Sequence, residues 1–125
     1  MGILSGLMGH ASEISIDAVR QEFSPILVEG EDLLMAYKVM RDMFVFTNKR
    51  LILVDRQGLT GSKTSYHTIP YSKIVRFSKE SAGLLDLDAE LKIWVQGKAE
   101  PITREFRKDK SVNDIYRLLS NAVLS

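Results

Sequence analysis

The chain has 125 residues, the size of one ordinary domain, and its 45% hydrophobic and 26% charged residues are typical of a globular protein. It contains no cysteine, which excludes disulfide frameworks, thiolate metal sites and cysteine nucleophiles and fits a reducing compartment. Seventeen basic and sixteen acidic side chains give a net charge of +1, so the overall charge offers no support for nucleic-acid binding.

Residues 1–24 carry apolar side chains at spacings of three and four, which predicts helical structure. The apolar positions form two stripes, Ile3, Leu4, Leu7 and Met8, then Ile16, Val19 and Phe23. Three glycines weaken the first stripe, since each costs about 1 kcal/mol relative to alanine in a helix. Ser15 is the predicted N-cap of the second helix, and Pro25 is predicted to end it.

The start of the chain is apolar but has no basic flank, so it makes a poor signal peptide. Gly6 stands where a myristoylation signal has Ser or Thr. No apolar run approaches the ~18–20 residues that span a bilayer. We therefore expect an unprocessed cytoplasmic protein without a transmembrane helix.

From residue 33 the hydrophobic period changes from that of a helix to that of a strand. The pattern predicts seven strands, at residues 33–39, 43–47, 50–55, 65–69, 74–79, 90–96 and 102–106. The clearest signal is a hairpin at residues 44–55, where two apolar runs flank the polar turn at residues 48–50. Two sets of side chains are expected to share a strand face: Leu33, Met35, Tyr37 and Val39 in the first strand, and Val75 and Phe77 in the fifth.

The last element is predicted to be an amphipathic helix, with Ser111 and Asp114 as a capping-box variant at its start. Its apolar stripe consists of Val112, Ile115, Leu118, Leu119 and Ala122. Seven antiparallel strands must curl into a barrel or sandwich, because two long exposed edges would invite aggregation. The predicted fold is therefore mainly β, with an N-terminal helical segment (1–27) and a seven-stranded antiparallel barrel or sandwich capped by the C-terminal helix (28–125).

Short motifs spread over residues 28–123 resemble the bacterial pleckstrin-homology (PH) domain family, and the N-terminal segment is similar to that family too. The motifs are Ala36-Tyr37-Lys38, Arg41-Asp42, Phe46-Thr47, Arg50-Leu51-Ile52, Asp55, Gln57-Gly58, Ile69-Pro70-Tyr71, Ile74, Phe77-Ser78, and Asp86, Asp88, Glu90 and Leu91. The resemblance implies a small barrel that assembles into symmetric rings, often pentameric. It implies no established enzymatic activity and no settled ligand.

No catalytic motif is present, since the chain lacks a P-loop, a G-x-G-x-x-G loop and a nucleophile elbow. His10 and His67 have no second ligand at metal spacing. The carboxylates of Asp86, Asp88 and Glu90 lack the spacing and the glycine of a calcium loop. We therefore expect a protein that is not an enzyme and that uses no cofactor or metal.

Lys38 and Arg41 are weak candidates for an anion site. They flank the first strand-to-strand turn, where eukaryotic PH domains carry a basic cluster for inositol phosphates. Such a site needs several converging cations, because each exposed ion pair contributes little. The turn is short and Asp42 follows at once, which favours an ordinary solvated turn.

The candidate contact residues are Trp94, Phe44 and Phe46, with Leu4, Leu7 and Met8 of the N-terminal stripe. Trp94 alternates with polar neighbours and is expected either on the outer face, where exposed aromatics mark interfaces, or in the core if that face is reversed. The N-terminal stripe packs on its own barrel, between subunits or on a membrane. Residues 1–19 contain no Lys or Arg, which favours protein contact over a membrane surface.

The leading functional hypothesis is a cyclic homo-oligomer, with five subunits as one expected number, that serves as a scaffold or binds a protein or peptide. The alternative is a peripheral module that binds anionic lipid. No nucleic-acid partner is expected. The identity of the partner and the pathway are not encoded in any motif of the chain.

Overall fold

The computed structural model describes residues 12–39, 42–57, 62–81, 88–107 and 110–125. In chain order its elements are β1 (Ser12–Ile14), α2 (Ile16–Phe23), the 3-10 turn η1 (Ser24–Ile26), β2 (Leu33–Val39), β3 (Asp42–Thr47), β4 (Arg50–Gln57), β5 (Lys63–Pro70), the 3-10 turn η2 (Tyr71–Lys73), β6 (Ile74–Glu80), β7 (Asp88–Val95), β8 (Ile102–Arg107) and α3 (Lys110–Leu124). All strand pairings are antiparallel.

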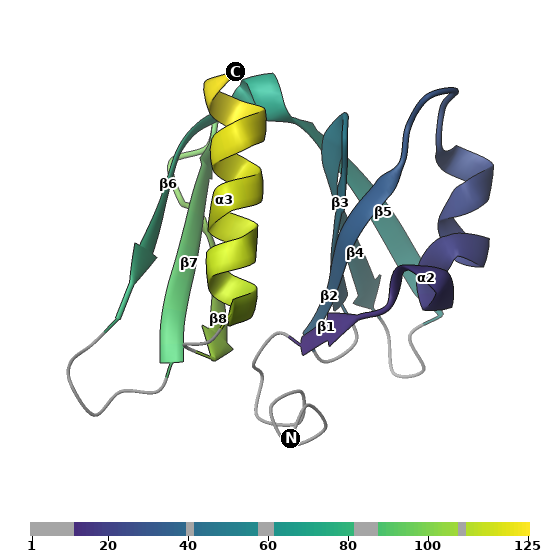
Figure 1. The fold of residues 1–125 in the computed structure, drawn as a ribbon, viewed down its shortest axis with the longest axis horizontal. Helices are drawn as coiled ribbons and strands as arrows, with labels where there is room; N and C mark the ends of the chain where they lie inside the picture. Colours follow the sequence, from purple (N-terminus) through teal and green to yellow (C-terminus); the bar gives the residue numbers. More distant parts are fainter. Residues whose placement is uncertain (1–11, 40–41, 58–61, 82–87, 108–109) are drawn as a thin grey trace.

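The strands form two sheets, one in the order β1-β2-β3-β4-β5 and the other in the order β6-β7-β8. Helix α3 packs against the three-stranded sheet, and α2 lies on the far side of the five-stranded sheet (Figure 1). The predicted fold class is confirmed: a mainly β, PH-like arrangement of two sheets with a C-terminal helix and an N-terminal helix. All seven predicted strands are present.

The count of seven strands is one short, because residues 12–14 form an eighth, β1, inside the segment predicted to be helical. These three residues lie between the two predicted apolar stripes, and they pair with Ala36–Lys38 of β2 instead of continuing a helix. The second predicted helix is present as α2, and its N-cap is confirmed, since the Ser15 hydroxyl accepts a hydrogen bond from the Ala18 amide at 3.2 Å. Pro25 follows α2 within η1, as predicted.

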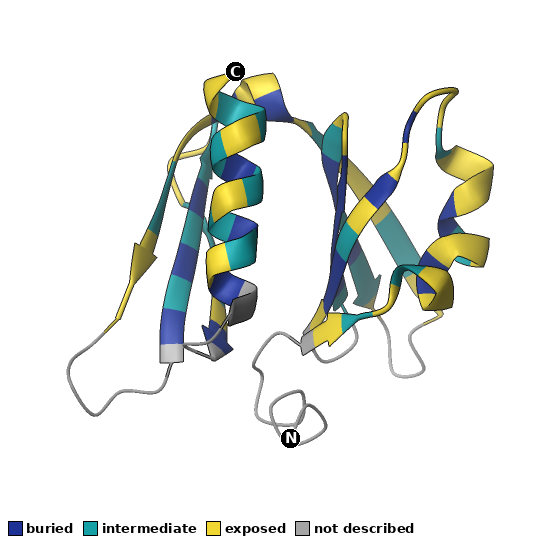
Figure 2. Ribbon diagram, viewed as in Figure 1, coloured by how far each residue is buried: buried dark blue, intermediate teal, exposed yellow. Residues whose placement is uncertain are grey.

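Two hydrophobic cores lie on opposite faces of the five-stranded sheet. Buried positions recur along its strands (Figure 2). The larger core fills the space between the sheets and α3, and the smaller lies under α2. Strand β3 contributes to both, because Phe44 and Phe46 enter the larger core while Met43 and Val45 enter the smaller. The apolar run of the predicted hairpin therefore reflects a strand buried on both faces.

Two predicted strand faces are wrong, because each strand contains a β-bulge. In β2, Leu33 pairs with Thr47 and Met35 with Phe46, so Leu34 is an extra residue. Leu33 therefore lies in the smaller core, on the face opposite Tyr37. In β6, Val75 is the extra residue between Ile74 and Arg76, and its side chain is 60% exposed instead of lying beside Phe77.

The apolar stripe of the last helix is confirmed. Val112, Ile115 and Leu119 are buried in the larger core, and Leu118 and Ala122 pack against it. The predicted start is wrong by two residues, because the helix begins at Lys110 and Ser111 is therefore already helical and cannot be its N-cap. No helix among the described residues is long and apolar enough to cross a membrane.

Candidate functional site

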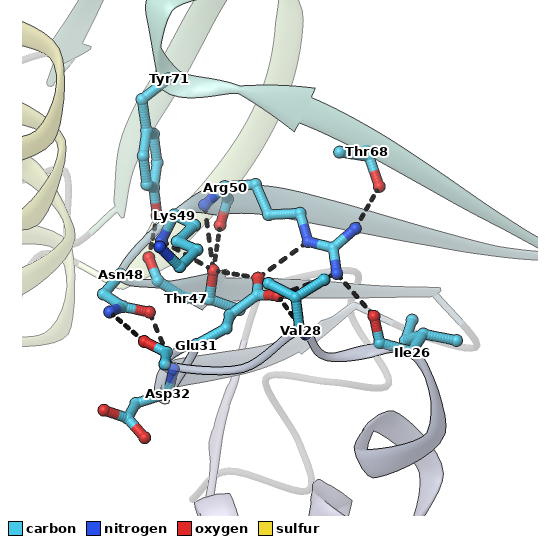
Figure 3. A network of polar contacts seen from close by, with 11 residues as sticks. Ile26, Val28, Glu31, Asp32, Thr47, Asn48, Lys49, Arg50, Thr68 and Tyr71 are labelled. Carbon is cyan, nitrogen blue, oxygen red and sulfur yellow. Dashed lines mark hydrogen bonds and ion pairs between the residues drawn. The ribbon is translucent and has the colours of Figure 1, made fainter.

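A buried ion pair joins the start of β2 to the β3–β4 turn (Figure 3). The guanidinium of Arg50 donates to both carboxylate oxygens of Glu31, from Nε to Oε2 at 2.8 Å and from Nη2 to Oε1 at 3.0 Å. The same guanidinium donates to the Ile26 carbonyl at 2.8 Å and to the Thr68 hydroxyl at 3.0 Å. Glu31 also accepts from the Thr47 hydroxyl at 2.7 Å. This one cation therefore ties four elements together.

The environment of Glu31 strongly favours its charged form. Its side chain is only 1% exposed, and burial alone would raise its pKa. The hydrogen bond from Arg50 outweighs that effect, with help from Thr47 and the Val28 amide, and lowers the pKa of Glu31 from 4.5 to about 2. A carboxylate so fully paired serves as a structural tie and is unsuited to act as a general acid or base near neutral pH.

The turn at residues 48–50, which the sequence marks only as polar, is closed by this network. The Asn48 side chain accepts from the Asp32 amide at 2.8 Å and donates to the Gly30 carbonyl at 2.9 Å. The hydroxyl of the buried Tyr71 donates to the Thr47 carbonyl at 2.7 Å. Burial, with a smaller effect of the Glu31 charge, raises the pKa of Tyr71 well above its ordinary range, so Tyr71 stays neutral.

A second polar cluster, which we call the latch, consists of Glu22, Arg56 and Tyr66. Arg56 Nη2 contacts both Glu22 oxygens at 3.0 and 2.9 Å, and the Tyr66 hydroxyl donates to Glu22 Oε2 at 2.6 Å. Burial would lower the pKa of Arg56, but Glu22 outweighs it and raises that pKa. The hydrogen bond to Glu22, followed by burial, raises the pKa of Tyr66 above 10.0. The latch holds α2 against β4 and β5.

Replacing Tyr66 by phenylalanine is expected to lower the free energy of unfolding by about 1 kcal/mol, the usual contribution of one hydrogen bond. Because the pKa of Tyr66 is raised in the folded state, this contribution is complete below pH 10.0 and is lost as the pH rises through the folded value. Urea unfolding of both proteins between neutral and alkaline pH measures it. A stability difference that grows above pH 10.0 would contradict the assignment.

A crevice of about 350 Å³ opens where the start of β2, the end of β3 and η2 meet the C-terminal turns of α3. Its lining side chains are half apolar or aromatic and half neutral and polar: Leu34, Leu118, Ala122 and Tyr71, then Thr47, Asn48, Asn121 and Ser125. No lining side chain is formally charged. The volume is in the range of small ligand sites, which is about 300–1,000 Å³.

The outer face of the three-stranded sheet carries a charged aromatic platform. The guanidinium carbon of Arg76 lies 3.9 Å from the centroid of the Trp94 ring. Beside it, Lys92 lies between Glu80 at 3.7 Å and Glu90 at 3.5 Å. Trp94 is half-buried and lies on the face opposite Ile93, which enters the larger core, so of the two predicted positions the structure has the outer face. Arg and Trp are both enriched at protein interfaces.

The structure separates the other predicted contact residues. Phe44 and Phe46 are 2% and 0% exposed in the larger core, so neither side chain is available to a partner in this conformation. Lys38 is exposed on β2. Leu4, Leu7, Met8 and Arg41, with His10 and Asp86, lie outside the described residues.

Sequence reasoning missed the Glu31–Arg50 tie, the latch and the crevice. Glu31 and Arg50 are 19 positions apart and each lies in an ordinary polar turn signal, so no local pattern pairs them. Within the described ranges, no three His, Asp or Glu side chains gather as a metal site. The Glu31–Arg50 pair and the latch each connect elements that are far apart in the sequence.

Comparisons with known proteins agree with this architecture. A family model described as Bacterial PH domain matches residues 2–123. The uncharacterized protein YjqA of Bacillus subtilis is 52% identical over 121 residues, 96% of this chain and 97% of that protein. YozO, another uncharacterized protein of Bacillus subtilis, is 32% identical over 111 residues, 89% of this chain and 93% of that protein.

Two crystal structures are similar in both fold and sequence. A DUF1696-family protein with a pleckstrin-homology domain from Shewanella loihica has a TM-score of 0.83 and 49% identity, covering 92% of this chain and 98% of that one. A pleckstrin-homology domain from Shewanella amazonensis has a TM-score of 0.77 and 48% identity, covering 89% and 100%. The family match spans nearly the whole chain and the fold agrees with it, so the chain belongs to the bacterial pleckstrin-homology domain family.

Proposed function

We propose that this chain is a non-enzymatic PH-like module that assembles into a closed homo-oligomeric ring, with a pentamer as the expected form, and that acts as a scaffold or protein-binding module. The observation that supports it most is the free edge of β5. This strand has eight residues, is largely exposed and pairs only with β4 in the described part of the chain. Long free edges tend to pair with another chain.

The three-stranded sheet supplies complementary edges. Among the described strands, β6 and β8 each pair only with β7. Pairing an edge of the five-stranded sheet of one subunit with an edge of the three-stranded sheet of the next is a heterologous contact. Heterologous contacts close into rings when the rotation permits it. The Arg76–Trp94 platform lies on β6 and β7 and would flank such a contact.

Native mass spectrometry and light scattering at micromolar concentration are expected to give one closed oligomer. A clean monomer under these conditions would rule out the ring. The platform is tested in the same assay with Trp94→Ala, which is expected to weaken assembly while the folded state is retained.

Proline substitutions at two neighbouring positions of β5 test the edge itself. Successive N–H groups of an antiparallel strand point to opposite edges. Of Thr64→Pro and Ser65→Pro, one therefore removes an outward-facing donor and the other removes a ladder bond to β4. We expect the first of these to be folded and monomeric. The edge is not the contact if that folded variant still forms the full oligomer.

A further inference from the structure

The crevice beside the C-terminal end of α3 has the chemistry of a site for an uncharged peptide segment. We propose that it receives an extended segment of a partner protein, with one apolar side chain in the crevice and the flanking peptide groups on Leu34 and Asn121. This inference rests on the protein-binding role proposed above and names the site.

The bulge in β2 shapes one wall. Leu34 is the extra residue, with no register partner in β3, and β1 pairs only with Ala36–Lys38. Residue 34 is thus outside both ladders, although it lies in a strand. Its side chain is 46% exposed and lines the crevice. A bulge disrupts the ladder locally and redirects a side chain. Here it leaves the apolar side chain of Leu34 exposed, next to a backbone segment that has no register partner.

Helix α3 supplies the opposite wall. Leu118 and Ala122 line it on the side that packs against the larger core, and Asn121 lies between them on the exposed side. The Asn121 carboxamide makes no hydrogen bond within the described residues, whereas that of Asn48 is already bonded on both sides. A free carboxamide presents one acceptor and two donors, which match the N–H and C=O of a peptide group.

The lining side chains disfavour an anionic occupant. None of them is charged, and Glu31, which accepts a hydrogen bond from the lining residue Thr47, is already paired with Arg50. An anionic ligand would lose hydration here without gaining a counter-charge from these side chains. The buried Tyr71 closes the floor with an aromatic ring, and its hydroxyl is already directed to the Thr47 carbonyl. An apolar side chain between two peptide groups fits these constraints.

The test titrates the full chain with N-acetyl-L-leucinamide as the probe and monitors binding by NMR of the protein. We expect saturable shifts of the Asn121 side-chain amide and of the Leu34 and Leu118 methyls, with a Kd in the millimolar range that is typical of so small a ligand. N-acetyl-L-leucine, which carries one negative charge, is expected to bind at least about fivefold more weakly. Equal binding of this anionic probe, or no saturable shift, would overturn the site.

Two variants and a matched control locate the binding. Leu34→Ala and Asn121→Ala change exposed side chains. Each is expected to raise the Kd of the probe at least about threefold, the effect of losing one contact or hydrogen bond. Val75→Ala removes an exposed apolar side chain from the other bulge, which does not line the crevice, and should leave the Kd unchanged. Equal effects of Leu34→Ala and Val75→Ala would refute the location.

A capped tripeptide, acetyl-Ala-Leu-Ala-amide, distinguishes a peptide from a free small molecule. Added peptide groups should tighten binding if the segment runs along Leu34 and Asn121, and unchanged or weaker binding would refute a peptide occupant. Light scattering of the same samples reports the ring independently. A monomer that binds the tripeptide would refute the ring while supporting the crevice.

Discussion

Replacing Arg50 by alanine is expected to lower the free energy of unfolding by about 3–5 kcal/mol, the typical effect of removing one partner from a buried ion pair. The Glu31 side chain is 1% exposed, so its charge would remain buried without compensation. The variant also loses the contacts that Arg50 makes with Ile26 and Thr68. Urea unfolding at neutral pH, followed by circular dichroism, measures the difference.

Arg56→Ala is the matched control. Its partner Glu22 is 30% exposed, so water can solvate the carboxylate after the cation is removed. We therefore expect a loss of about 1 kcal/mol, close to the upper value for surface pairs. Equal losses in the two variants would show that burial of Glu31 does not decide the effect.

The same ion pair makes the stability depend on pH in the acid range. The pKa of Glu31 falls from 4.5 in the unfolded chain to about 2 in the folded one. Its contribution is therefore complete above pH 4.5 and is lost as the pH falls through about 2. Glu31→Gln removes this titration, so the gap between the two proteins should narrow by about 1.4 kcal/mol per pH unit as the pH falls from 4.5 to about 2. A constant gap down to pH 3 contradicts the assigned pKa.

Leu119→Ala is expected to destabilise the protein by about 2–5 kcal/mol, because it removes buried methyl groups and leaves a cavity. Leu119 is 0% exposed, and α3 contributes three buried side chains to the larger core. Arg117→Ala, on the same helix with a side chain 71% exposed, should cost less than about 0.5 kcal/mol. Thermal unfolding of the two variants tests whether α3 stabilises the sheets or is merely attached to them.

Structural features that depend mainly on neighbouring residues were predicted correctly, with one exception. The cap at Ser15 and the stop near Pro25 depend on neighbouring backbone groups, and both are present. The stripe of α3 follows from the period of a helix and is also present. The exception is the start of α3, where the capping pattern predicts Ser111 as the N-cap but Ser111 is already the second residue of a helix that begins at Lys110.

Non-local pairing explains the errors. β1 is a strand because β2 offers it an edge, although it lies in a segment predicted to be helical. The bulged residues Leu34 and Val75 carry no special residue type that would mark them, yet each shifts the faces of its strand. Phe44 and Phe46 were predicted as contact residues because an apolar run does not show which layers cover the two faces of the strand. In the structure both faces are covered, one by each core.

The sequence by itself determined the order of seven of the eight described strands, the C-terminal helix and the family, because hydrophobic period and short motifs depend on neighbouring residues. The tertiary structure alone decided which side chains meet: Glu31 with Arg50, Glu22 with Arg56 and Tyr66, and Leu34 across the crevice from α3. Strand register and bulges decide which side chains come into contact, and both features depend on the partner strand. A single extra residue in β2 places Leu33 in the smaller core, opposite Tyr37, and leaves Leu34 exposed at the surface where we expect a partner to bind.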